Sequence, residues 1–164
     1  MAGIAPKRRV APAVRGQRFA VVAARFNEPI SKKLLDGAVG ALADHAVTGS
    51  AVEVHWVPGS FELPQAARAL ARTGRFAGIV CVGVVIKGAT PHFEYVCSAA
   101  AQGIERVALD TGVPVTFGVI TALTEEQAWE RAGGAVGNRG EEAALAALEM
   151  AGWLRALSGR RGKS

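Results

Sequence analysis

The feature that most constrains the fold is the run at residues 78–86, which contains no charged, hydroxyl or amide side chain. The run is much shorter than the ~18 apolar residues that a membrane-spanning helix needs, so we expect no membrane partner. A continuous apolar strand is buried on both faces, which is typical of a strand inside a parallel sheet. Because parallel strands need crossover connections, usually helices, this run predicts an α/β fold.

Other short apolar runs alternate with segments of helical periodicity. We expect further strands at residues 19–24, 51–57 and 113–120. The second of them alternates in part, as an edge strand does. Capping patterns at Thr124 and Asn138 predict two closing helices, the first of them ended by Gly133 and Gly134. The order predicts a three-layer α/β/α sandwich with a central four-stranded parallel sheet, flavodoxin-like in architecture.

Charge is distributed unevenly along the chain. Nine of the 19 basic residues lie in residues 1–18 and 155–164, which contain no acid, so the body between them has an excess of acidic residues. A nucleic-acid-binding protein needs its basic face on the folded part, and nucleic acid is therefore not an expected partner. We predict a flexible basic tail at residues 1–17, a single domain at 18–157 and a second basic tail at 158–164.

The cysteines and the first residues bear on the compartment. Cys81 and Cys97 have neither the number nor the spacing of a disulfide framework or a metal site. The chain begins without the apolar segment of a signal peptide. We therefore expect two buried thiols, no metal and a cytoplasmic protein.

The turn after the apolar run at 78–86 carries the most chemistry. It contains Gly88, and Thr90 is the expected N-cap of a helix whose first residue is Pro91. Backbone N–H groups in such a turn and at a helix start can bind an anion. The helix dipole disfavours a charged imidazolium at His92, so we expect a neutral imidazole that can accept a proton. The alternative is a histidine that only bonds a nearby carbonyl.

The turns after the first two strands are expected at the same edge of the sheet. They carry Phe26 and Phe61, which can stack on a planar ring, and Glu62, which can hold hydroxyl groups or only stabilise a helix start. Taken alone, Phe117 is expected in the core and Arg131 at the surface. Phosphate-loop, dinucleotide and hydrolase-nucleophile motifs are absent from the sequence, so these patterns support an α/β protein with an anion site.

Four sequence blocks, in this order, resemble the lumazine synthase family of riboflavin biosynthesis. They are Ala-Arg-Phe-Asn at 24–27, Val-Pro-Gly-Ser-Phe-Glu-Leu-Pro at 57–64, Gly-Val-Val-Ile-Lys-Gly-Ala-Thr-Pro-His-Phe-Glu-Tyr-Val at 83–96, and the segments within 117–140. The third block is the most specific. Together they cover nearly the whole region from Phe19 to Met150.

The resemblance implies a transferase that works without a cofactor. Its reaction condenses 5-amino-6-(D-ribitylamino)uracil with 3,4-dihydroxy-2-butanone 4-phosphate to give 6,7-dimethyl-8-ribityllumazine, phosphate and water, the penultimate step of riboflavin biosynthesis. A Schiff base forms, phosphate leaves and the ring closes. Each step moves protons, which suits a positioned imidazole, and holding two substrates together supplies further rate.

The resemblance also implies roles for individual residues. His92 is expected to transfer protons. The residues expected to hold the ribitylaminouracil are Phe26, Ser60, Phe61, Glu62, Val84, Val85, Ile86 and Phe117. Those expected to hold the butanone phosphate are Ala89, Thr90 and Arg131, with Gly88 and Arg139 as further candidates. Arg139 stands where the family usually has lysine, and the two side chains differ in reach and geometry.

In the family, Phe117 and Arg131 are supplied by the neighbouring subunit, so an inactive monomer is expected. The resemblance implies a homo-oligomer, either a pentamer or an icosahedral assembly of pentamers, with riboflavin synthase as a candidate partner. The short segment at 131–138 favours a shell, whereas Pro12 argues against an N-terminal strand added to a neighbour's sheet. Three alternatives remain: a non-catalytic phosphoanion-binding protein, an inactive shell-forming protein and an archaeal-type riboflavin synthase.

Overall fold

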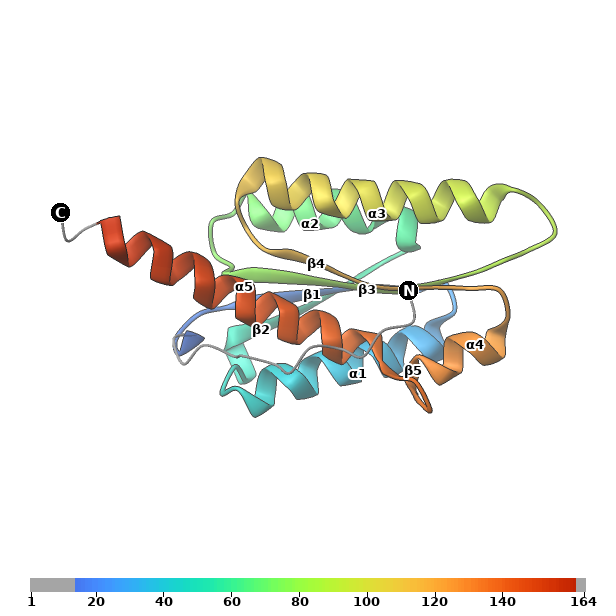
Figure 1. Ribbon diagram of the computed structural model, residues 1–164, viewed down its shortest axis with the longest axis horizontal. Helices are drawn as coiled ribbons and strands as arrows, with labels where there is room; N and C mark the ends of the chain where they lie inside the picture. Colours follow the sequence, from blue (N-terminus) through green and yellow to red (C-terminus); the bar gives the residue numbers. More distant parts are fainter. Residues whose placement is uncertain (1–13, 162–164) are drawn as a thin grey trace.

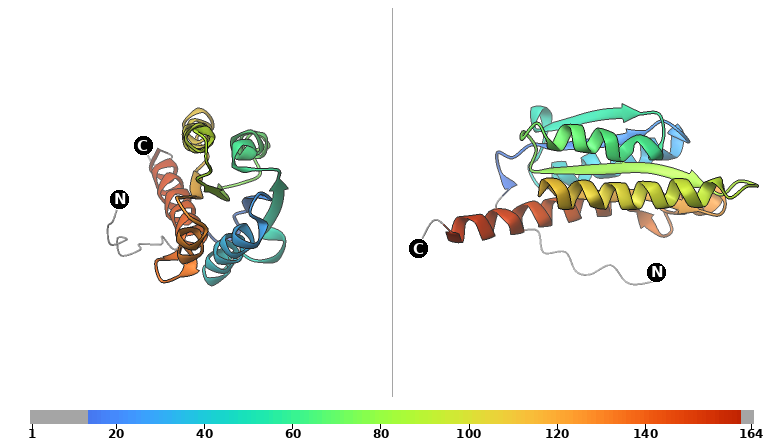
Figure 2. Two further views of the ribbon diagram at one scale, coloured as in Figure 1. Left: turned by 90° about the vertical axis from the view of Figure 1, so that its right-hand side faces the viewer. Right: turned by 90° about the horizontal axis from the view of Figure 1, so that it is seen from above.

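A computed structural model describes residues 14–161 of the 164-residue chain. Its parallel sheet has the order β2-β1-β3-β4, with strands β1 Phe19–Ala24, β2 Val52–Val57, β3 Gly78–Ile86 and β4 Val115–Ala122. One face is covered by α2 Leu63–Ala71 and α3 His92–Thr111, and the other by α1 Glu28–Asp44, α4 Glu125–Glu130 and α5 Arg139–Arg161 (Figure 1). The fold is thus the predicted flavodoxin-like α/β/α sandwich, and Figure 2 shows its three layers end-on.

Strand β1 shows how the sequence produces this arrangement. All six of its residues are buried, and successive side chains enter opposite layers. Phe19 and Val21 pack into the core on the α1 and α5 side, whereas Ala20 and Val22 pack into the core on the α2 and α3 side. A strand with apolar residues at every position can therefore only lie inside the sheet, where burial on both faces stabilises it.

The strands follow the sequence closely. Strand β3 spans the predicted residues, and β2 lies at a sheet edge as its partial alternation predicts. Strand β4 begins at Val115, two residues later than expected, and extends to Ala122. The delay follows Pro114, which has no N–H to donate to a neighbouring strand.

Two of the predicted helix caps are present in the structure. The Thr124 hydroxyl accepts a hydrogen bond from the Gln127 N–H at 3.3 Å and so caps α4. Asn138 Oδ1 accepts hydrogen bonds from the N–H groups of Gly140 and Glu141 at the start of α5. Both caps satisfy backbone donors that the first turn of a helix leaves unpaired.

The predicted start of α3 is wrong by one residue. The helix begins at His92, with Pro91 at the N-cap position, and the Thr90 hydroxyl does not cap it. Pro91 already has helical dihedral angles, φ −63° and ψ −3°, so the chain enters the helix without a side-chain cap. His92 is consequently the first helical residue.

Helix α4 ends earlier than predicted, at Glu130, because the glycines expected to end it belong to a small hairpin. The hairpin pairs β5 Ala132–Gly134 with β6 Gly137–Asn138 in antiparallel orientation. Gly133 and Gly137 have φ values of +111° and +99°, which only glycine adopts readily. Strands this short show no alternation, so periodicity does not reveal them.

The predicted tails fall partly outside the described residues. Val14, within the first of them, is 3% exposed and packs into the core on the α1 and α5 side. Helix α5 continues to Arg161, beyond the end of the sheet (Figure 1). Within residues 14–161, every helix is too short or too polar to cross a bilayer.

Candidate functional site

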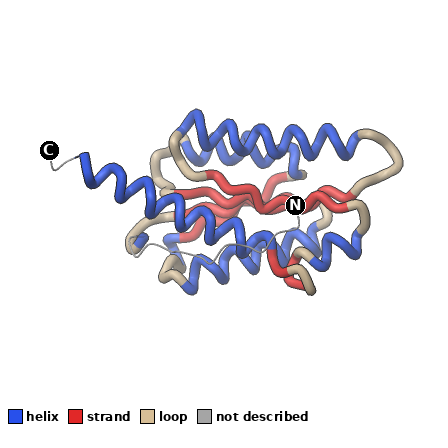
Figure 3. The backbone as a smooth tube through the Cα atoms, in the orientation of Figure 1, coloured by secondary structure: helices blue, strands red, loops and turns tan. Residues whose placement is uncertain are grey.

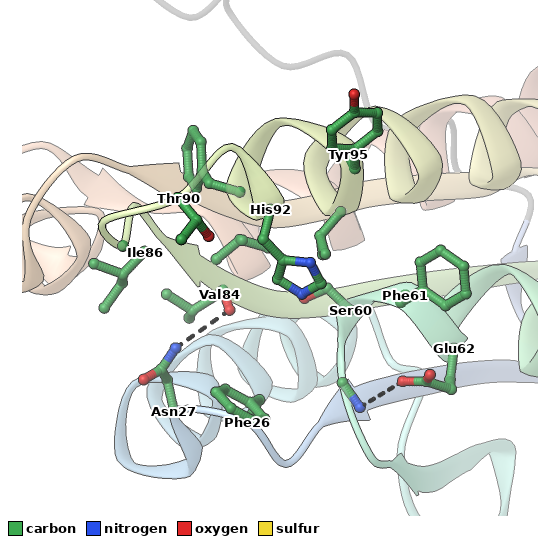
Figure 4. A pocket seen from close by; sticks show the side chains of 15 residues that line it. Phe26, Asn27, Ser60, Phe61, Glu62, Val84, Ile86, Thr90, His92 and Tyr95 are labelled. Atoms are coloured by element: carbon green, nitrogen blue, oxygen red, sulfur yellow. Dashed lines mark hydrogen bonds between the residues drawn. The ribbon is translucent and has the colours of Figure 1, made fainter.

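A cavity of about 540 Å³ opens at the carboxyl ends of β1, β2 and β3. This is the position at which open α/β sheets bind ligands, and sites for small molecules usually measure roughly 300–1,000 Å³. The turns after the three strands and the first residues of α3 form its walls, which are mostly apolar (Figure 4).

The turn after β1 brings Phe26 to the cavity. Its N–H donates a hydrogen bond to the Pro58 carbonyl at 3.0 Å, which ties the turns after β1 and β2 together. Asn27 adopts a left-handed φ of 57°, which asparagine tolerates, and its Nδ2 donates to the Val84 carbonyl at 3.4 Å. These bonds fix the backbone around Phe26, whose ring remains 74% exposed.

The turn after β2 forms the short 3₁₀ helix η3 Ser60–Glu62. The Glu62 carboxylate accepts a hydrogen bond from the Gly59 N–H at 2.9 Å, so one of its oxygens stabilises the turn and the other can meet a ligand. The Phe61 ring is 60% exposed beside the cavity. Aromatic rings held in fixed turns can stack on a planar ligand.

Ser60 is different because it is buried. It is 4% exposed, and its Oγ has no hydrogen-bond partner among the described residues. The space for this hydroxyl comes from Gly83 in β3, where a Cβ would lie 2.6 Å from the Ser60 Oγ. A buried hydroxyl without a partner lowers stability, so this group is available to a ligand in the cavity.

Strand β3 extends beyond β1 and leaves part of one edge unpaired. Its pairing with β1 ends at Val82, whereas its pairing with β4 continues to Ile86. The Lys87 N–H donates to a β4 carbonyl, so by alternation the backbone groups of Val84 and Ile86 face the β1 side. The Val84 carbonyl is engaged there by Asn27, and no other partner of these groups is found within residues 14–161. The other groups can bind the polar edge of a ring.

The loop between β3 and α3, the long loop at the right of Figure 3, is exposed throughout. Gly88 and Thr90 line the cavity, whereas the Ala89 side chain between them does not. The Lys87 ammonium lies 3.8 Å from the Glu94 carboxylate, an exposed pair that spans the base of the loop.

His92 lines the cavity from the first turn of α3. Its ring is exposed and points into the cavity between Thr90 and Ser60 (Figure 4). Within residues 14–161, the imidazole ring of His92 makes no hydrogen bond or ion pair. The structural alternative, a histidine bonded to a nearby carbonyl, therefore has no support here, and the ring is free to exchange protons with a ligand.

The cavity wall carries one carboxylate, that of Glu62, and no lysine or arginine from the described residues. The amino end of α3 adds only a partial positive charge. A phosphate group bound here would therefore need a cation from outside this wall.

A family model described as 6,7-dimethyl-8-ribityllumazine synthase matches residues 16–155. The chain belongs to the lumazine synthase family. The match covers most of the chain and confirms the family that the four sequence blocks predict. The family is one of transferase-type enzymes that form lumazine in riboflavin biosynthesis, act on small molecules and typically assemble into oligomers.

Besides Ala89, three predicted site residues lie outside the cavity wall of their own chain: Phe117, Arg131 and Arg139. Phe117 is on the edge strand β4, and its ring is 43% exposed. The expectation that Phe117 is a core residue, drawn from the strand pattern alone, is therefore wrong, because an edge strand leaves one side of its residues uncovered.

The two arginines are held by their own chain. The Arg131 guanidinium donates to the Gln127 carbonyl at 2.9 Å and lies 3.6 Å from the Glu130 carboxylate. The Arg139 guanidinium forms an ion pair with Glu142. Both side chains are partly exposed.

The cavity also includes residues to which the sequence analysis gave no role. They are Asn27, Gly59, Phe93, Tyr95 and Val96. The position of Asn27 directly after a strand was a usable signal, because asparagine favours the left-handed turns found there. The last three follow His92 on α3. Residues of these types are common in helices that pack against a core, so their sequence gives no sign of a cavity.

The cysteines are placed differently from each other. Burial raises the pKa of the Cys81 thiol to about 12, so it cannot supply a thiolate nucleophile. Burial also raises the pKa of the Cys97 thiol, but Cys97 is only half-buried, so the prediction of a buried thiol is wrong for it. Over residues 14–161, no group of three or more His, Cys, Asp or Glu side chains is arranged to hold a metal ion.

Proposed function

We propose that this member of the family condenses 5-amino-6-(D-ribitylamino)uracil with 3,4-dihydroxy-2-butanone 4-phosphate. The products are 6,7-dimethyl-8-ribityllumazine, phosphate and water. One observation carries the proposal: a single cavity joins aromatic rings, an unpaired strand edge and a glycine turn that leads into an imidazole. These are the parts needed to hold a planar ring beside a phosphorylated ketone.

The ribitylaminouracil is assigned to the side of the cavity formed by β1, β2 and β3. Phe26 stacks on its ring, and Phe61 contacts the ring and the ribityl chain. The backbone at Val84–Ile86 binds the polar edge of the ring. Ser60 and the free oxygen of Glu62 hold ring and ribityl groups, which the fixed η3 turn supports.

The butanone phosphate is assigned to the loop at Gly88–Thr90. Its phosphate meets the backbone N–H groups of this loop and the amino end of α3. The substrate amine attacks the ketone carbon, water leaves to give the Schiff base, phosphate is eliminated, and the ring closes with loss of water. His92 accepts and returns protons during these steps, and this role is supported because its ring has no partner among residues 14–161.

The missing cation supports a site shared between subunits. The phosphate carries two negative charges, yet the described wall offers no lysine or arginine. We assign this charge to Arg131 of a neighbouring copy, whose guanidinium can bind phosphate oxygens in pairs, with Arg139 as a second candidate. Phe117, exposed on the edge strand, is assigned to the neighbour's ring site.

The proposal includes at least a pentamer, as such or within an icosahedral shell, in the cytoplasm. Riboflavin synthase, which consumes the product, is a candidate partner. Sedimentation velocity on the active enzyme tests the assembly. We expect no active species smaller than a pentamer, and a fully active monomer contradicts the shared site.

The activity is tested by mixing the full chain with both substrates while following lumazine fluorescence and free phosphate. We expect the two products in equal amounts. Binding of the phosphate ester without turnover in assembled protein supports a non-catalytic phosphoanion-binding protein instead, and neither binding nor turnover supports an inactive shell. Incubation with lumazine alone is the control for the archaeal-type riboflavin synthase, which makes riboflavin from it.

A further inference from the structure

The side chain of Asn138 joins two helices that are distant in sequence. Its Nδ2 donates a hydrogen bond to the Lys33 carbonyl of α1 at 3.0 Å. Its Oδ1 accepts hydrogen bonds from the N–H groups of Gly140 and Glu141 at 2.9 and 3.1 Å, at the start of α5. One short side chain therefore caps α5 and ties it to the middle of α1.

Gly37 of α1 makes the room for this side chain. A Cβ at Gly37 would lie 2.5 Å from the Cγ, Oδ1 and Nδ2 atoms of Asn138. Non-bonded carbon atoms pack at roughly 3.5–4.0 Å, so any side chain at this position has to displace Asn138 from its three hydrogen bonds. A Cβ at Gly40, one turn along the same helix, would have no heavy atom within 4 Å and would point into solvent.

A second close approach fixes the same junction. A Cβ at Gly140 would lie 2.0 Å from the Leu34 carbonyl oxygen, so the first turn of α5 lies directly against the α1 backbone. Here two backbones meet without intervening side chains. The position of the α5 start is therefore set within a fraction of an ångström, as close packing in proteins requires.

This junction carries both arginines of the proposed shared site. The Arg139 N–H donates to the Arg131 carbonyl at 2.9 Å, and Asn138 pairs with Ala132 in the hairpin between them. Asn138 thus joins to α1 the hairpin and the start of α5, the segment on which both arginines stand.

We infer that Asn138, seated over Gly37, is a positioning residue that sets where Arg131 and Arg139 are presented to the phosphate of the substrate. The inference rests on the proposed function. Phe26 and Phe61 belong to turns at the ends of other strands. Displacing the Asn138 side chain should therefore weaken binding of the phosphorylated substrate and leave binding of the pyrimidine nearly unchanged.

Four variants of the full-length enzyme test this inference: Gly37→Ala, Asn138→Asp, the double variant Gly37→Ala/Asn138→Ala, and Gly40→Ala as the matched control on the same helix. Asn138→Ala alone is the reference for the double variant. For each we would measure the assembly state, the thermal unfolding temperature, kcat, and the KM of both substrates separately.

We expect Gly37→Ala to raise the KM of the butanone phosphate roughly tenfold, because hydrogen bonds to charged groups are strong and depend on geometry. The KM of the pyrimidine should change by less than about twofold, as should every kinetic constant of Gly40→Ala. Asn138→Asp keeps an oxygen that caps α5 but loses the donor to Lys33, so it should fold and show the same selective rise.

The double variant separates steric displacement from other effects. Asn138→Ala removes the atoms that a Cβ at residue 37 would meet, so adding Gly37→Ala to it should raise the KM no further. Additive effects of the two substitutions overturn the inference.

Two further outcomes would overturn the inference, and they differ in what they say of the proposed function. If the wild type is active and the variants only melt earlier, with both KM values unchanged or raised equally, Asn138 has a structural role and the inference fails alone. If the assembled wild type shows no turnover, the proposed function fails and the inference fails with it. Should Gly37→Ala not assemble, Asn138→Asp, which keeps the cap, decides between these outcomes.

Discussion

The two ends of the parallel sheet are built in different ways. At the amino end, the Glu53 carboxylate of β2 accepts hydrogen bonds from the guanidinium groups of Arg18 and Arg75 and lies 3.3 Å from His55 Nε2. Arg75 also lies over the Phe76 ring, with its guanidinium carbon 4.8 Å from the ring centroid. These charged side chains pair around Glu53, although Arg18 Nε, Gln17 Oε1 and Thr116 Oγ1 at this end have no partner among the described residues.

At the carboxyl end, polar groups stay without partners. The Ser60 hydroxyl is buried and unbonded within the described residues, and the His92 ring makes no hydrogen bond there. The rings of Phe26 and Phe61 are mostly exposed. The Glu53 cluster joins residues of one end to each other, whereas the buried Ser60 hydroxyl costs stability unless a ligand meets it. The cavity and the exposed rings lie at the carboxyl end, where we propose that the substrates bind.

The largest expected effect is that of His92→Ala at the carboxyl end. We expect kcat to fall by ~10²-fold or more, the usual contribution of general acid–base catalysis, with little change in thermal unfolding because the ring is exposed. Single-turnover fluorescence measures the rate. The matched control is His55→Ala at the other end, which should lower stability slightly and leave kcat unchanged. A similar loss of kcat in both variants contradicts the comparison.

Replacing an aromatic residue at each end separates binding from folding. Phe26→Ala or Phe61→Ala should raise the KM of the ribitylaminouracil about tenfold, since stacking of a base on an aromatic side chain contributes about 1–3 kcal/mol. Their unfolding temperatures should barely move. Phe76→Ala, at a 6% exposed ring of the amino end, should instead lower stability by about 3–5 kcal/mol in denaturant titrations. The comparison fails if Phe76→Ala changes the KM of the ribitylaminouracil more than Phe26→Ala or Phe61→Ala does.

Ser60→Ala gives a smaller effect of the same kind. Removing a buried hydroxyl that has no partner should leave the free energy of unfolding unchanged or increase it, while the KM of the ribitylaminouracil rises about two- to tenfold through one lost hydrogen bond. Urea unfolding and steady-state kinetics measure both quantities. The buried Ser31, whose Oγ donates to the Phe26 carbonyl at 3.3 Å, is the control, because Ser31→Ala should lower stability.

The smallest effect is expected from Glu53→Gln at the amino end, and it should depend on pH. The Arg75 guanidinium, which bonds Glu53, holds the pKa of this carboxyl below its usual value of 4.5. A carboxyl group with a lowered folded-state pKa stabilises the protein above the unfolded-state pKa, and this contribution is lost as the pH falls through the folded-state value.

The unfolding temperature of Glu53→Gln should therefore lie below that of the wild type at neutral pH, and the gap should close below about pH 4.5. Thermal unfolding of both proteins from neutral to acidic pH measures the gap, with kcat expected to be unchanged. A gap that stays constant down to the most acidic point shows that the charge of Glu53 is not responsible.

Much of the fold is visible in the sequence because its signals are local. The apolar run of β3 and the Thr124 and Asn138 caps depend on residues within a few positions of each other, and all three agree with the structure. The sequence blocks likewise indicate the family that the match over residues 16–155 shows. The chemical roles given to His92 and the other site residues stay predictions.

The sequence by itself determined the alternation of strands and helices, the central place of β3 and the end of the sheet that carries the cavity. Only the tertiary structure decided that β3 extends beyond β1, that Glu53 pairs with Arg18 and that the Asn138 side chain packs against Gly37. The reason is physical. Periodicity and capping act over a few residues, whereas these contacts join positions up to 105 residues apart and depend on strand register and helix packing.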